Sequence, residues 1–202
     1  MRRLPCLLVF ALLAVFGRVE PVAGQAPRLG ILVGRSLVGG GDSRTLVGSG
    51  VTGADQAGLH LRAFADFPLE ATPLSLRVEA FYNRLTSGPN TFDAGVNGKA
   101  ALVDQTSGLT GSFVATTSRR AAVAPYFALG AGLFTSRLGH NPDPQSTQVA
   151  TTYRGMGLGL VAGGGLRMRV GRPTLLLDWR YYQALSNTRG SSFMPLSIGL
   201  AF

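Results

Sequence analysis

Histidine is the side chain best suited to acid–base chemistry near neutral pH, and this sequence has only two. His60 lies in LHLRA and His140 in GHNPD, and neither is followed by a serine two places later. Asp143 lies close to His140, but the surrounding NPDP is typical of a turn. No metal-ligand spacing, nucleophile elbow or phosphate-binding loop is present, and the glycines of GLVAGGGLRM lack a dinucleotide-binding context. The sequence therefore predicts no catalytic residues, no metal and no cofactor.

A group of charged residues shares another property: each alternates with apolar neighbours along an extended segment. These are Arg62, Asp66, Arg77, Glu79, Arg167, Asp178 and Arg180. If their common face points into an enclosed space, the four positive and three negative side chains can pair with one another, because buried charges need partners. The pattern favours an ion-pair network that fills the interior, and a gate or a catalytic cluster is the alternative.

The segments that carry these charges are predicted to be β-strands. Apolar side chains recur at every second position, which is the period of a strand between two different environments. In one segment, for example, Leu59 and Leu61 alternate with His60 and Arg62. The eight expected strands cover residues 28–36, 58–67, 74–83, 109–118, 125–134, 156–170, 174–183 and 195–202. Most have about ten residues, the length that a tilted strand needs to cross a bilayer.

The connections between these segments alternate in length. Long polar stretches occupy residues 36–54, 85–107 and 135–152, with a shorter one at 185–190, whereas the intervening connections are short. In an antiparallel meander, successive connections emerge at opposite ends, so one end carries all the long loops. Short turns on one side and long loops on the other are typical of outer-membrane β-barrels. The long loops are therefore expected on the extracellular side.

The two faces of the strands indicate which one meets lipid. A soluble barrel such as a lipocalin needs a charged exterior, but only 14% of the residues are charged and 28 are glycine. Glycine is costly in a strand, yet it suits the crowded interior of a narrow barrel. We therefore expect the apolar face to meet lipid and the glycine-rich face to line a lumen that the side chains of eight strands fill. Such a lumen is not expected to be a pore.

The N-terminal segment is predicted to be a secretory signal peptide. Basic residues precede the apolar run LPCLLVFALLAVF, which is shorter than the roughly 20 residues of a membrane-spanning helix. Val22 and Gly24 suit the positions before a cleavage site, which predicts residues 1–24 as the signal and 25–202 as one barrel domain. The net charge of +9 is dispersed along the chain, so nucleic-acid binding, which needs a contiguous basic patch, is not predicted.

Three stretches carry a resemblance to a known family: PYFALGAGL at 125–133, LLLDWRYYQ at 175–183 and the terminal PLSIGLAF. With the signal peptide, they resemble the small OmpA/OmpX-like outer-membrane barrels, including opacity-type proteins. The resemblance covers the whole mature chain and implies an all-β fold, an eight-stranded antiparallel up-and-down transmembrane barrel. It also implies Sec-type export and insertion by the barrel-assembly machinery, with Phe202, Leu200 and Ile198 as the assembly signal.

The same resemblance implies a monomer in outer-membrane lipid with a structural or surface-interaction role, whose extracellular loops face a partner. Two other functions stay open. Some eight-stranded barrels are lipid A-modifying acyltransferases or deacylases, and His140 with Asp143 lies in a loop on the appropriate side. The other is an exported soluble, lipocalin-like ligand binder.

Overall fold

The computed structural model describes residues 26–38, 57–69, 72–86, 100–118, 121–142, 151–185 and 192–202. Within these stretches no helix is long and apolar enough to span a membrane. The predicted signal segment, residues 1–24, lies outside the described residues, so its assignment and the domain boundary after it stay predictions.

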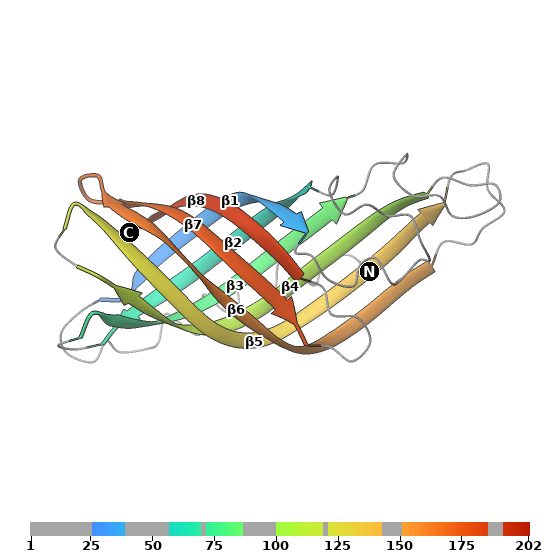
Figure 1. The fold of residues 1–202 in the computed structure, drawn as a ribbon, viewed down its shortest axis with the longest axis horizontal. Coiled ribbons are helices and arrows are strands. Elements are labelled where there is room, and N and C mark those ends of the chain that lie inside the picture. Colours follow the sequence, from blue (N-terminus) through green and yellow to red (C-terminus); the bar gives the residue numbers. More distant parts are fainter. Residues whose placement is uncertain are drawn as a thin grey trace.

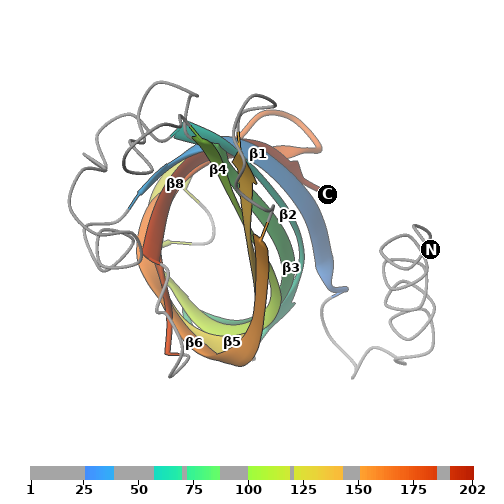
Figure 2. The same ribbon diagram turned by 90° about the vertical axis from the view of Figure 1, so that its right-hand side faces the viewer.

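The strands follow one another around a closed barrel, and each pairs antiparallel with its neighbours in the sequence (Figure 1). Their bounds are β1 Arg28–Val38, β2 Ala57–Pro68, β3 Leu74–Thr86, β4 Ala100–Thr116, β5 Val123–Pro142, β6 Thr151–Arg169, β7 Thr174–Ala184 and β8 Ser192–Ala201. β8 closes the ring by pairing with β1, where Ile198 lies opposite Val33. Figure 2, an end-on view, shows the ring that the strands form. The prediction of an eight-stranded up-and-down barrel is confirmed.

Apolar side chains cover the outside of the barrel. Ile31 exposes 63% of its surface, Phe113 61% and Leu158 64%. Along β3, exposed or half-buried residues alternate with buried ones from Leu76 to Thr86. Strands that cross a bilayer need this combination of a closed sheet and an apolar outer surface. A soluble lipocalin-like barrel is excluded, because its outer surface would carry polar and charged side chains instead of these exposed apolar ones.

The lumen is packed with side chains. An apolar cluster near the short-turn end consists of Leu32, Phe64, Val114, Tyr126, Ala128, Leu176 and Ala201. A more aromatic cluster nearer the long-loop end consists of Phe81, Leu85, Phe134, Val161, Tyr182, Ala184 and Phe193. Rings of this size need small neighbours, and the ring of Phe134 takes the space that a Cβ atom at Gly159 would require. Glycine on the inner face therefore makes room for bulky side chains from other strands.

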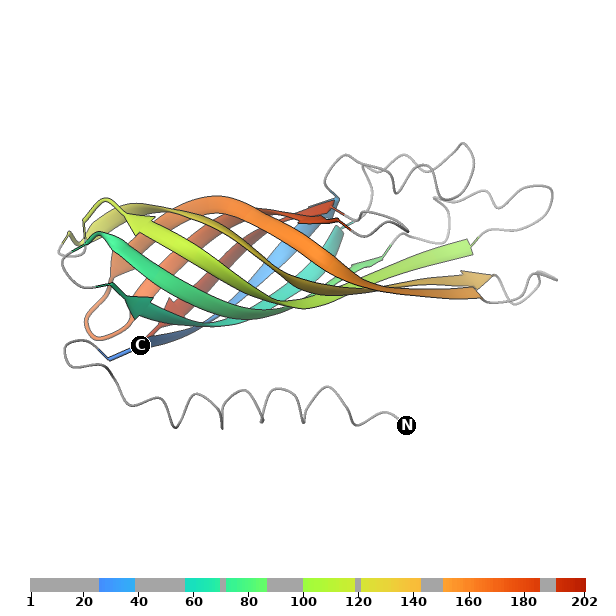
Figure 3. The same cartoon turned by 90° about the horizontal axis from the view of Figure 1, so that it is seen from below.

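The two ends of the barrel differ. At one end short connections join β2 to β3, β4 to β5 and β6 to β7. The last of these contains Gly171, whose φ of 68° lies in the left-handed region that favours glycine. At the other end β4, β5 and β6 run past the remaining strands (Figure 3).

The expected bounds of the fourth, fifth and sixth strands are too short at this long-loop end. β4 begins at Ala100, β5 ends at Pro142 and β6 begins at Thr151, so the strands take up parts of the predicted loops 85–107 and 135–152. Alternation is a signal of two different environments. Beyond the lipid both faces of a strand meet water, and the signal disappears.

Candidate functional site

Four charged side chains form a closed group in the middle of the lumen, and we call them the central cluster: Arg62 from β2, Glu79 from β3, and Asp178 and Arg180 from β7. Arg62 Nη2 lies 2.6 Å from Asp178 Oδ1, and its Nε lies 3.6 Å from Glu79 Oε2. Arg180 reaches the same two carboxylates, with Nη1 2.5 Å from Glu79 Oε1 and Nε 3.2 Å from Asp178 Oδ1. All four side chains are buried. Two guanidinium groups thus neutralise two carboxylates away from water.

Hydroxyl groups from other strands complete the central cluster. Tyr126 donates a hydrogen bond to Asp178 Oδ2, and Thr110 donates to Glu79 Oε1 at 3.1 Å. Arg62 Nη1 donates to the hydroxyl of Tyr182 at 3.2 Å. A buried ion pair is tolerated when further hydrogen bonds satisfy its atoms. Strands on several sides of the barrel supply three of them here, whereas Arg180 Nη2 has no hydrogen-bond partner among the described residues. The cluster therefore crosses the lumen and links its walls.

Asp66 and Arg77 form a second, separate pair nearer the short-turn end. Arg77 donates through Nε and Nη2 to the two oxygens of Asp66, at 2.5 and 2.7 Å, in the bidentate geometry of a strong ion pair. Its guanidinium carbon also lies 4.1 Å from the centre of the Phe64 ring, within the range of a cation–π contact. The predicted network is thus divided into two groups at different depths.

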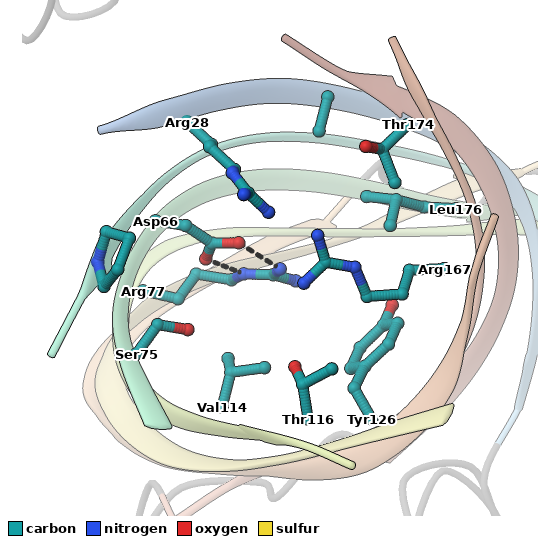
Figure 4. Close-up of a pocket in the computed structure, with 12 residues that line it drawn as sticks. Arg28, Asp66, Ser75, Arg77, Val114, Thr116, Tyr126, Arg167, Thr174 and Leu176 are labelled. Atoms are coloured by element: carbon teal, nitrogen blue, oxygen red, sulfur yellow. Dashed lines mark hydrogen bonds and ion pairs between the residues drawn. The ribbon is translucent and has the colours of Figure 1, made fainter. Parts of the chain in front are cut away.

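Arg167 is brought to the lumen but forms no ion pair with any residue in the described part of the chain. It lines a pocket at the short-turn end together with Arg28, Asp66 and Arg77, and we call these four residues the mouth cluster. Figure 4 shows the three guanidinium groups directed into the same space. Arg28 was not among the residues predicted to face the lumen, although its position in β1 has the same parity as the buried Leu32. That parity alone predicts that the Arg28 side chain points into the lumen.

The histidines occupy two unrelated positions. His60 is buried among aromatic rings, with the ring centres of Phe81, Tyr182 and Phe193 5.5 to 6.0 Å from its own. His140 falls within β5, where its backbone pairs with that of Thr151, rather than in a loop. Asp143 lies outside the described residues, so the pairing of His140 with Asp143 stays a prediction. Among the described residues, no three His, Cys, Asp or Glu side chains gather as metal ligands would.

The residues assigned to the assembly signal share the outer face of the last strand. Ile198 and Leu200 are exposed on β8. Phe202 is exposed next to them, and its backbone exchanges two hydrogen bonds with that of Leu29. Their recognition by the assembly machinery stays a prediction.

No family model matches the chain, and no curated protein does. Several solved structures resemble it, including the following three. Neisserial surface protein A is 17% identical, covers 87% of this chain and 95% of its own, and has a TM-score of 0.51. Ail, the attachment invasion locus protein of Yersinia pestis, is 15% identical over 88% of this chain and 100% of its own, with a TM-score of 0.51. A major outer membrane protein from Thermus thermophilus is 16% identical, covers 88% of this chain and 99% of its own, and also has a TM-score of 0.51.

At these identities the likeness concerns the fold. It agrees with the closed ring of antiparallel strands and with the apolar outer surface that embedding in lipid requires. The chain therefore has the fold of the small eight-stranded β-barrels of the outer membrane.

Proposed function

We propose that the protein is an outer-membrane surface-interaction protein that presents a projecting β-sheet to polyanionic ligands outside the cell. The projecting sheet consists of residues 100–105 of β4, 137–142 of β5 and 151–154 of β6, which pair with one another. At its base, residues 103–105 also pair with the end of β3. Its β6 residues precede the part of β6 that pairs with β7. The filled lumen supports a role as an anchor rather than as a channel.

The observation that carries this proposal is a pair of arginines on the projecting sheet. Arg137 and Arg154 lie directly opposite each other in the pairing of β5 with β6, and both are exposed. Like charges at directly opposed positions repel, and no described carboxylate forms an ion pair with either. A ligand with several negative charges would relieve that repulsion by binding across both guanidinium groups.

The chemical class of the ligand follows from the guanidinium group, which binds oxyanions through two parallel hydrogen bonds. One of the similar structures, that of Ail, is a complex with the heparin analogue sucrose octasulfate. The opposed arginines support the same class of ligand for this chain, a sulfated or phosphorylated polysaccharide.

Heparin binding by the full chain in detergent tests the proposal. We expect the double variant Arg137→Gln/Arg154→Gln to bind heparin about tenfold more weakly or worse, because each lost charge-assisted hydrogen bond is worth about 1.5–3 kcal/mol. The matched control is Arg169→Gln/Arg172→Gln, which removes the same charge at the short-turn end and should change binding by less than about twofold. An equal loss in both variants, or no binding by the unmodified chain, would show that the proposal is wrong.

A further inference from the structure

We propose that the short-turn mouth of the lumen is a phosphate-binding site, in which Arg28, Arg77 and Arg167 hold one oxyanion on the periplasmic side. The short turns of an outer-membrane barrel face the periplasm, so this site lies at the opposite end from the projecting sheet. The inference is independent of the surface interaction proposed above.

The geometry of the pocket suits a small anion. The three arginines come from β1, β3 and β6, and their guanidinium groups converge on one space (Figure 4). That space has a volume of about 30 Å³, which is more than a single water molecule needs. Ser75 and Thr116 also line the pocket, so hydroxyl donors lie beside the guanidinium groups. An oxyanion at the centre would meet donors on several sides.

The charge of the mouth cluster is unbalanced. Three guanidinium groups face one carboxylate, that of Asp66, and both oxygens of Asp66 are already bonded to Arg77. Arg28 and Arg167 form no ion pair with any described residue. Cations that converge without counter-charge repel one another, and the repulsion grows where the surroundings are partly shielded from water. A bound anion of one or two charges would remove this excess.

A buried donor inside the pocket points to the same ligand. Arg77 exposes only 3% of its surface, and its Nε and Nη2 atoms are taken by Asp66. Its third nitrogen, Nη1, has no hydrogen-bond partner in the described part of the chain, like Arg180 Nη2 in the central cluster, but Nη1 belongs to a residue that lines the pocket. Buried donors without a partner are costly and rare in native proteins. An oxygen of a bound phosphate group would accept this hydrogen bond.

A phosphate group fits better than a carboxylate, because three guanidinium groups from three strands can each bind a different oxygen of a tetrahedral anion. Two sources share this chemistry. One is free inorganic phosphate, and the other is the headgroup of an anionic phospholipid in the inner leaflet, which lies at the level of this mouth.

The experiment is calorimetric titration of the full chain, folded in maltoside micelles, with inorganic phosphate at constant ionic strength set by chloride. We expect saturable binding of one phosphate per barrel. Arg167→Gln and, independently, Arg28→Gln should each weaken it about tenfold or more, since each removes charge-assisted hydrogen bonds. The matched control is Arg172→Gln, in the exposed turn between β6 and β7 and outside the pocket, which should change the affinity by less than about twofold.

Absence of saturable binding, or an equal loss in Arg172→Gln, would overturn the proposal. Arg28 and Arg167 are only partly buried, so their variants should fold, and the mobility of unboiled samples on a denaturing gel checks this. A second titration, in micelles that contain phosphatidylglycerol, distinguishes the sources. If phosphatidylglycerol weakens the binding of inorganic phosphate, the site exists and its ligand is a lipid headgroup. If the phosphate affinity is unchanged, the site exists and its ligand is free phosphate.

Discussion

The central cluster and the mouth cluster contain the same residue types in one lumen, yet their charges are arranged differently. In the central cluster each carboxylate contacts both arginines, so the charge is balanced and the side chains are fully buried. In the mouth cluster a single carboxylate faces three arginines, of which two are partly exposed. Charge balance and depth, rather than residue type, distinguish the arginines of the central cluster from those proposed to bind phosphate at the mouth.

Access to water is the physical reason for the difference. A charge in the middle of the lumen has no solvent to replace a missing partner, and desolvating it costs several kcal/mol. At the mouth, Arg28 and Arg167 keep part of their surface in contact with solvent. Excess positive charge is therefore tolerable there before a ligand binds, whereas the same excess between Arg62 and Arg180 would strongly destabilise the barrel.

The largest effect is expected from Asp178→Ala, which leaves Arg62 and Arg180 with one carboxylate between them. Breaking a buried pair in this way typically costs about 3–5 kcal/mol, so the free energy of unfolding should fall by that amount. Urea unfolding in lipid vesicles, followed by the fluorescence of Trp179, measures it, because this residue is the only tryptophan and faces outward. An unchanged midpoint would mean that water reaches the central cluster.

A smaller loss is expected from Asp66→Asn, which breaks the bidentate pair with Arg77 at the mouth. The cost should be about 1–3 kcal/mol, the range for a buried donor left without its acceptor. It should be smaller than for Asp178 because Asp66 is itself partly exposed. The variant also raises the excess positive charge, so phosphate should bind more tightly than to the unmodified chain. Stability measured in urea and affinity measured by calorimetry should therefore move in opposite directions. A loss of unfolding free energy as large as that of Asp178→Ala would show that the mouth cluster is as important for stability as the central cluster, which would contradict the comparison.

Most of the fold could be predicted from the sequence. Lipid on one side of each strand and a packed lumen on the other impose a strict alternation of outward and inward side chains. Leu175 and Leu177 face outward and Leu176 inward, and the alternation predicts all three orientations. The outer ends of β4, β5 and β6 were not predicted to be strands. Residues such as Asp104 and Gln105 lie in a strand but do not alternate with apolar neighbours.

The site was predictable as a set of inward residues but not as a set of partners. Parity along β2 and β7 directs Arg62 and Asp178 into the lumen. Whether their side chains meet depends on the register of every strand around the ring and on their height along the barrel. No local pattern encodes that height, so one network was expected where the structure has two clusters. Arg28, by contrast, could have been found from parity alone.

The most direct test of this contrast is the same substitution at both depths: Arg180→Gln in the central cluster and Arg167→Gln at the mouth. Both remove one positive charge, and the unfolding free energies are compared in urea, in phosphate-free buffer. Arg180→Gln should lower the free energy of unfolding by about 3–5 kcal/mol, because two buried carboxylates keep one cation. Arg167→Gln should leave it within about 1 kcal/mol or raise it slightly, because it removes repulsion from a partly solvated group. Equal losses in the two variants would contradict the account.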